Sequence, residues 1–414
     1  MESESAVESE SAVESESESV DNGEESSEKA TDPETGDSSQ SGSESGDEPS
    51  NPVDEPTTPG TEPSKQPAVS KFTGKDGKTL RELVVEYMVN MASIEWTAGV
   101  LIDYSSQSTT LVYKPGEKYL GMVYNNNATG LEKFLSILDE NNVSVETKTS
   151  WNESPGNSCA TSIRHAYQQV SPVVEFGYSA DMLPYYEKTG IVAIGNIDWS
   201  HYDGSNTLIS VFNQNDRNDL LEAYALMQPG DSLVRYIDTG GHAQMITKEP
   251  FVMRKSDGTI DPDNSYLYIT EQNNLLNHTR ELPSSWKVDY PVSFATCQNG
   301  SYLPVTIQAL IDGEADAPTF EFSSAPTKED LASGTIKGNL KCNYAINEVR
   351  FEFKSGGEVV KSFSTYPYAR SFGFKTVRAE LGLADLPAGD YEMTVTAITG
   401  PATETIFSET FTKN

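Results

Sequence analysis

The stretch from Pro155 to Val170, PGNSCATSIRHAYQQV, places a thiol at the start of a predicted helix. Pro155 to Asn157 form a turn signal and Ser158 is a good N-cap, so Cys159 takes the first helical position. An apolar face follows at helical spacing: Ile163, Ala166, Tyr167 and Val170. Free backbone N–H groups and the helix dipole favour a thiolate there and can also receive an oxyanion. The alternative is that Cys159 is a small buried hydrophobic residue.

A thiol nucleophile needs a histidine within hydrogen-bond reach and a third polar group that orients the imidazole. The chain has four histidines. His165 lies six residues after Cys159 in the same helix and points elsewhere, and His201 and His278 fall in irregular segments. His242 opens a predicted strand after a Gly-Gly turn, which is where a catalytic base is needed.

Three consecutive antiparallel strands are predicted to position these groups: Gly230–Asp238, His242–Thr247 and Ser265–Gln272. The third strand ends in Glu271 and Gln272, and either could accept a hydrogen bond from the imidazole. Successive strand residues point to opposite faces, so only one of them can serve. Glu271 is favoured because a carboxylate stabilises an imidazolium better than an amide does.

The segments GNSC, GDSLVRY and GHAQMI, with a later polar strand residue, resemble the NlpC/P60 superfamily of papain-like enzymes. The family's Gly-Asp matches Gly230 and Asp231, and its histidine matches His242. The resemblance covers roughly residues 80–310. It implies an α+β domain with a Cys-led helix packed on an antiparallel sheet, and a triad of Cys159, His242 and Glu271. Family members typically act outside the bacterial membrane on amide bonds of peptidoglycan stem peptides.

The sequence departs from this family at two positions of the site. Ser-Cys-Ala-Thr stands where the family usually has Asp-Cys-Ser-Gly, and Glu271 or Gln272 stands where the third residue is commonly His. An acyltransferase or other amidase on the same scaffold therefore stays open, as does a non-catalytic surface adhesion protein. A transglutaminase-like fold ranks lower because Asp261 and Asp263 lie in a turn-like loop. No cofactor or metal is expected, since neither a zinc-like Cys/His spacing nor a Gly-rich phosphate loop is present.

Composition places a long acidic tail before the folded region. Asp and Glu number 63 against 29 Lys and Arg, a net charge of −34, and residues 1–70 hold roughly 20 acidic and about 2 basic side chains. Such a segment is expected to be disordered, and the acidic remainder argues against nucleic acid as a partner. The three cysteines leave at least one thiol free. No membrane span is expected, and the tail resembles one that follows a removed export signal, which predicts an extracellular or cell-surface protein.

Two ordered regions are expected, a papain-like domain at 71–312 and an all-β domain at 315–414. Amphipathic helices are predicted at 78–93, 131–138 and 215–228, with a short buried strand at 190–195. Aromatic residues before the thiol, above all Trp96 and Tyr124 with Tyr119, could line a groove for an extended substrate or could pack in the core.

The C-terminal region has strands in place of long helical patterns. Alternating segments at 347–353, 358–363 and 389–398 predict an antiparallel β-sandwich of immunoglobulin-like size. Its aromatic residues, Tyr366, Tyr368, Phe372 and Phe374, are read either as core or edge packing, which is favoured, or as a surface for sugar or cell-wall polymer.

Overall fold

The computed structural model describes residues 70–107, 109–146, 148–184, 189–200, 202, 208–278 and 281–414. The acidic tail expected at 1–70, except for its last residue, and His201 lie outside these residues. The described chain combines strands and helices, with sheet predominating, so the expected mixture of α and β structure is confirmed. All described residues belong to one compact unit.

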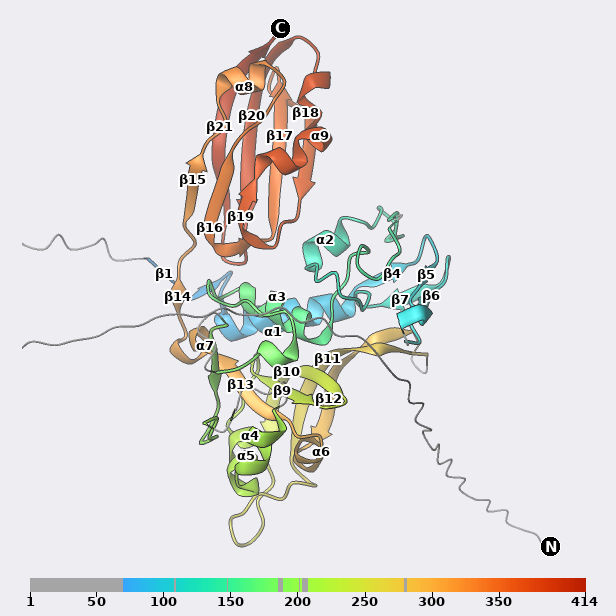
Figure 1. Ribbon diagram of the computed structural model, residues 1–414, viewed down its shortest axis with the longest axis vertical. Coiled ribbons are helices and arrows are strands. Elements are labelled where there is room, and N and C mark those ends of the chain that lie inside the picture. The colour runs from blue at the N-terminus through green and yellow to red at the C-terminus, as the bar shows by residue number, and fades with distance from the viewer. Residues whose placement is uncertain are drawn as a thin grey trace, which may run out of the picture. The chain divides into compact units, whose positions relative to one another are not determined.

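A six-stranded antiparallel sheet forms the centre of the first region (Figure 1). In sheet order its strands are β12 (Ser284–Ser293), β11 (Tyr266–Asn277), β10 (Gly240–Phe251), β9 (Ser232–Ile237), β13 (Leu303–Ile307) and β8 (Ile191–Ala193). The three strands predicted from the sequence are therefore the neighbours β9, β10 and β11. Both β10 and β11 run several residues beyond the predicted segments.

Strand β9 lies inside this sheet and has both faces covered. Ser232, Leu233 and Val234 are all buried, so burial does not alternate along its first half. Helices α1 (Leu80–Ser93) and α3 (Cys159–Gln168) pack against each other, and α3 packs on β10 (Figure 1). Helices α5 (Arg217–Ala225) and α6 (Phe294–Asn299) contribute to a second apolar cluster with side chains of β9, β10 and β11.

Local sequence explains where α1 and α3 begin. Thr79 caps α1 in a capping box with Glu82, and Ser158 caps α3 in a capping box with Thr161. The apolar faces predicted for both helices are almost entirely buried. The hydroxyl of Tyr167 lies 2.7 Å from Ser232 Oγ, which fixes α3 against the middle of the sheet.

The remaining helices of the first region are short. They are α2 (Leu131–Leu135), α4 (Ile209–Gln214), α7 (Gln308–Asp312), η1 (Ser105–Gln107) and η2 (Ser179–Asp181). Helix α2 ends three residues before the predicted boundary. Helix α5 ends at Ala225, three residues before the predicted boundary at 228, and Leu226 beyond its end is 60% exposed.

Four small two-stranded sheets complete this region. They pair β1 (Lys71–Phe72) with β14 (Ala315–Asp316), β2 (Gly74–Lys75) with β3 (Lys78–Thr79), β4 (Glu95–Thr97) with β7 (Lys118–Leu120), and β5 (Ile102–Asp103) with β6 (Val112–Tyr113). The β1–β14 pair joins the start of the described chain to the segment that leads into the C-terminal region.

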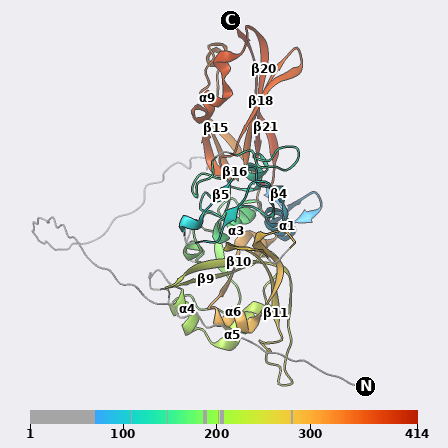
Figure 2. The same cartoon turned by 90° about the vertical axis from the view of Figure 1, so that its right-hand side faces the viewer.

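The C-terminal region consists of two antiparallel sheets around one core (Figure 2). One holds β15 (Phe320–Ser324), β16 (Asn339–Ile346) and β19 (Ala369–Gly373); the other holds β18 (Glu358–Thr365), β17 (Glu348–Ser355), β20 (Gly389–Ile398) and β21 (Thr403–Lys413). Short helices α8 (Lys328–Ala332), α9 (Arg378–Leu381), η3 (Phe374–Val377) and η4 (Leu383–Asp385) connect strands. Phe372 and Phe374 lie in the core, as the favoured reading had it.

Tyr368, by contrast, hydrogen-bonds to the first region. Its hydroxyl donates to Glu132 Oε2 at 3.1 Å and accepts from the Lys133 backbone N–H at 2.9 Å. Asn347 Nδ2 donates to Gln169 Oε1 at 3.2 Å. Phe372, Phe374 and Tyr368 thus do not form an open platform for a polymer, while the immunoglobulin-like assignment stays a prediction.

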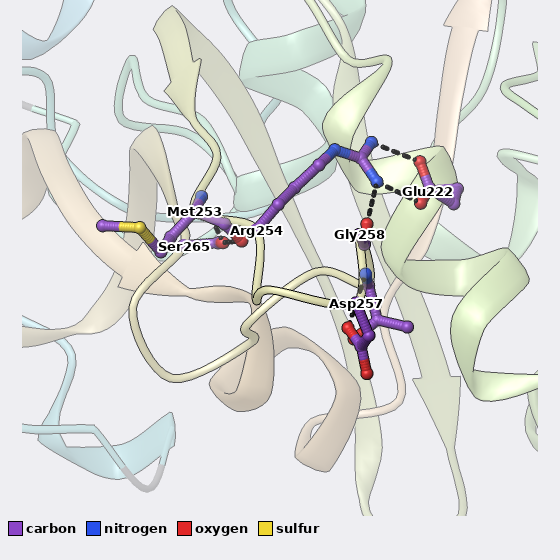
Figure 3. Close-up of polar contacts among 7 residues, drawn as sticks. Glu222, Met253, Arg254, Asp257, Gly258 and Ser265 are labelled. Atoms are coloured by element: carbon purple, nitrogen blue, oxygen red, sulfur yellow. Dashed lines mark hydrogen bonds and ion pairs between the residues drawn. The ribbon is translucent and has the colours of Figure 1, made fainter.

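The long connection between β10 and β11 is held in place by its own polar contacts (Figure 3). The guanidinium of Arg254 donates to both carboxylate oxygens of Glu222 on α5, each at 2.7 Å, and to the Gly258 carbonyl oxygen at 3.0 Å. The Met253 backbone N–H donates to Ser265 Oγ at 2.9 Å. These contacts tie the connection to α5 and to the residue that precedes β11.

Candidate active site

Cys159 lies at the N-terminus of α3, as predicted, and is 8% exposed. Its sulfur interacts with the backbone N–H groups of Ala160 and Ala243 and with the side chain of His242. Pairing between β10 and β11 begins only at Met245 and Thr270, so Ala243 lies beyond that ladder and its N–H is directed to the sulfur. The N-terminus of one helix and the open end of two strands therefore meet at the thiol.

His242 and Glu271 are joined across β10 and β11. His242 Nε2 lies 2.6 Å from Glu271 Oε2, and the side chains are 17% and 3% exposed. Because Nε2 is bound to Glu271, the imidazole contact with the Cys159 sulfur falls to the other ring nitrogen, Nδ1. Gln272 points to the opposite face and donates to the Met122 carbonyl oxygen at 2.8 Å. Of the two residues left open by the sequence, the structure thus places Glu271 beside the imidazole.

Two further side chains hold the Glu271 carboxylate. Lys287 Nζ donates to Glu271 Oε1 at 2.6 Å, and Gln244 Nε2 donates to Oε2 at 2.6 Å. Sequence reasoning identified neither. Gln244 could have been found, because it is two residues from His242 and shares its face of the strand. Lys287 could not have been found in this way, because the sequence analysis predicted no strand where β12 lies.

The electrostatics of the three residues favour a charged pair. Burial alone raises the pKa of the Cys159 thiol, but the hydrogen bond and charge of His242 outweigh it and hold that pKa below its usual value. Burial lowers the pKa of His242, whereas its bonds to Cys159 and Glu271 raise that pKa to about 9. Burial likewise raises the pKa of Glu271, while His242 and Lys287 lower it to about 2. Near neutral pH these directions correspond to a thiolate, an imidazolium and a carboxylate.

A cavity of about 310 Å³ opens beside Cys159. Its lining comes from the segment before α3, the start of α3, η2 and the β9–β10 hairpin: Tyr124, Asn126, Ser158, Cys159, Ala160, Tyr178, Ser179, Ala180, Tyr236 and Gly241. Tyr124 and Cys159 both line this cavity, and burial together with the Cys159 charge raises the pKa of the Tyr124 phenol. The structure therefore places Tyr124 where the sequence reading put a substrate-facing residue.

Trp96 requires a correction. Its side chain is 1% exposed and packs among Tyr113, Tyr119 and Phe134, with ring centroids 5.5–5.6 Å away. Its indole Nε1 donates to the Gly121 carbonyl oxygen at 2.9 Å. The aromatic spacing therefore builds a core, and neither Trp96 nor Tyr119 faces the cavity.

Gly241 allows η2 to approach the hairpin next to His242. A Cβ atom at this position would overlap Ser179 Oγ and would lie 2.6 Å from a ring carbon of Tyr236. Only glycine therefore lets the cavity wall from η2 close against β10. Close packing therefore explains why the second residue of the Gly-Gly turn is glycine.

The other described histidines and cysteines lie outside this site. His165 is buried and its Nε2 lies 2.9 Å from the Ala128 carbonyl oxygen, as expected for a poor partner of Cys159. His278 is exposed. Cys297 and Cys342 are free and buried, and burial raises the pKa of both thiols. Of the described thiols, Cys159 is distinguished by its lowered pKa.

The described residues include neither a metal-binding cluster nor a helix suited to cross a membrane. No group of three or more His, Cys, Asp or Glu side chains there could hold a metal ion. None of the described helices combines the length and apolar character needed to cross a bilayer.

Comparison with known proteins adds no assignment. No protein-family model matches the chain, and no curated protein sequence matches it significantly.

Proposed function

We propose that the protein is a cysteine hydrolase that cleaves amide bonds, with Cys159 as nucleophile, His242 as general base and acid, and Glu271 as the residue that orients the imidazole. The observation that carries this proposal is the continuous contact from the Cys159 sulfur through His242 to Glu271 Oε2, 2.6 Å from Nε2. A nucleophile, a base within hydrogen-bond reach and a group that orients the base are the three parts that thiol catalysis needs.

Acylation follows from this arrangement. The thiol proton passes to His242, and the thiolate attacks the carbonyl carbon, so that a C–S bond forms and the carbonyl oxygen becomes an oxyanion. The free N–H groups at the start of α3 stabilise this oxyanion. The imidazolium then protonates the amine nitrogen as the C–N bond breaks, which leaves a thioester.

Deacylation uses the same groups in reverse. His242 takes a proton from water, and the hydroxide that forms attacks the thioester carbon. The C–S bond breaks, the acid product leaves, and the proton returns to the sulfur. Glu271 stabilises the imidazolium in both halves because it stays ionised, with a pKa of about 2.

Features of the sequence support a substrate class and a location for the protein. The resemblance to NlpC/P60 enzymes supports a papain-like domain that acts on peptidoglycan stem peptides or other peptides. The acidic tail supports an extracellular or cell-surface location. A transfer of the acyl group to an acceptor other than water would use the same first half-reaction, so transfer is the second candidate on this scaffold. A non-catalytic adhesion protein would not require a histidine and a carboxylate beside Cys159, so the contacts with His242 and Glu271 favour the hydrolase over this alternative.

The decisive experiment is alkylation of the native protein by iodoacetamide between pH 5 and 9, with the modified cysteine located by mass spectrometry. The proposal predicts fast labelling of Cys159 at low pH in the wild type and loss of this fast reaction in His242→Ala. His278→Ala is the matched control, because His278 is exposed and lies outside the site. Labelling of Cys159 at the rate of an ordinary thiol, irrespective of His242, would remove the basis for a hydrolase.

A further inference from the structure

Arg235 is a cation without a counter-ion beside the proposed triad. It lies on β9, is partly buried, and its Nε atom is buried without a hydrogen-bond partner. Among the residues that the structure describes, no carboxylate forms an ion pair with its guanidinium. The chain carries 63 acidic side chains against 29 basic ones, so an arginine with no acid beside it runs against the composition.

The strand register places Arg235 next to His242. The two residues are direct partners in the β9–β10 ladder, and paired residues of antiparallel strands project to the same face. On that face Lys287 is paired with Glu271, which in turn binds His242. A row of side chains therefore crosses four neighbouring strands in the order Lys287, Glu271, His242 and Arg235.

Charge alternates along this row except at its last step. Lys287 and His242 both contact Glu271, but the residue after His242 is a second cation. Like charges on directly opposed strand residues repel, so the pairing of Arg235 with His242 is unfavourable by itself when His242 is protonated. Of the other partly buried arginines that the structure describes, Arg81 is paired with Asp231 at 2.8 Å, and Arg164 donates to the backbone carbonyl oxygens of Phe176 and Ala128.

Tyr302 holds the Arg235 guanidinium in place without neutralising it. The centre of the guanidinium lies 5.3 Å from the centroid of the Tyr302 ring, and the His242 ring lies 6.5 Å from the same ring. A cation–π contact orients the planar group and leaves its N–H edge free to donate. An ordered guanidinium with a free edge is suited to bidentate binding of a carboxylate.

We infer that Arg235 is a specificity residue that binds a substrate carboxylate close to the scissile amide bond. The inference rests on the proposed function, because it takes Cys159 as the point of attack. It names the substrate class as peptides or peptide-like amides that carry a free carboxylate within one residue of the bond that is cut. Substrates of that kind supply the anion that the row of side chains lacks.

The test compares two alkylating reagents that differ in charge. Iodoacetate carries a carboxylate and iodoacetamide does not, and both react with the same thiolate. The rate of Cys159 modification by each is measured at low ionic strength in the wild type, Arg235→Gln, Arg235→Lys and Arg217→Gln. Arg217 is the matched control because it is exposed at the start of α5 and its substitution changes the net charge equally.

The ratio of the iodoacetate rate to the iodoacetamide rate is expected to fall roughly three- to tenfold in Arg235→Gln. It should stay at the wild-type value in Arg217→Gln and recover in part in Arg235→Lys, which restores the charge without the planar fork. Added salt should reduce the wild-type ratio towards that of Arg235→Gln. The iodoacetamide rate reports whether each variant keeps an intact thiolate.

Two results would overturn the inference in distinguishable ways. An unchanged ratio in Arg235→Gln, with fast iodoacetamide labelling of Cys159, would exclude Arg235 as a carboxylate site and leave the triad standing. Slow reaction of wild-type Cys159 with both reagents would refute the thiolate itself, and the role of Arg235 would fall with the proposed function.

Discussion

Replacement of Glu271 by glutamine removes one negative charge from the proposed triad while keeping an oxygen that can accept from His242. In the wild type this bond is charge-assisted and spans 2.6 Å. A hydrogen bond to a charged group contributes about 1.5–3 kcal/mol and a neutral one about 0.5–1.5 kcal/mol. The difference of about 1–1.5 kcal/mol corresponds to roughly a tenfold smaller population of the thiolate–imidazolium pair.

The assay is the rate of Cys159 alkylation by iodoacetamide as a function of pH. At pH 6.5 the rate in Glu271→Gln should fall roughly tenfold, because His242 gives up its proton more readily and the pair shifts to neutral thiol and imidazole. Above pH 9 the rate should return towards the wild-type value, since the thiol then ionises without help from an imidazolium. Glu222→Gln is the control and should leave the pH profile unchanged, because this α5 carboxylate binds Arg254 and lies outside the site.

Two outcomes would refute this reasoning. An unchanged rate at pH 6.5 would mean that Glu271 does not stabilise the imidazolium. A rate lowered by the same factor at every pH would mean that the substitution acts on access to the thiol or on folding, and not on proton distribution.

Three further predictions concern His242, Gly241 and Trp96. Turnover of an amide substrate should decline as pH rises through about 9, because the pKa of His242 is about 9 and its protonated form must donate to the leaving amine. Alkylation of Cys159 should not decline in this pH range. A parallel loss of turnover and alkylation would contradict the role of His242 as general acid. Gly241→Ala should slow alkylation of Cys159, because its Cβ would overlap Ser179. Gly177→Ala is the control and should not slow it, since its Cβ would have only a contact at 3.8 Å. Equal rates in both variants would exclude the close approach of η2 to Gly241 as a determinant of the site. Trp96→Ala should reduce the free energy of unfolding, measured by denaturant titration, by about 3–5 kcal/mol, because it empties a buried site. The rate of Cys159 alkylation in the folded variant should stay close to wild type. A variant of normal stability that loses substrate affinity would instead support Trp96 as a substrate-binding residue.

Local sequence signals sufficed to place the two residues proposed as nucleophile and base. A turn, an N-cap and an apolar helical face place Cys159 at the first position of α3, since capping and periodicity act within a few residues. A Gly-Gly turn between two alternating segments likewise placed His242 at the start of β10. The candidates Glu271 and Gln272 came from the polar end of the third predicted strand, and strand alternation indicated that only one of them could serve.

Tertiary structure decided the features that depend on what faces what. The register of β10 and β11 puts Glu271 on the face of His242 and sends Gln272 to Met122, and a shift of one residue would have exchanged them. The pairing of β11 with β12 likewise brings Lys287 to Glu271. Aromatic spacing before the thiol fits a groove and a core equally well in sequence. Only packing shows that Trp96 is buried and Tyr124 lines the cavity, because burial is set by segments far apart in the chain.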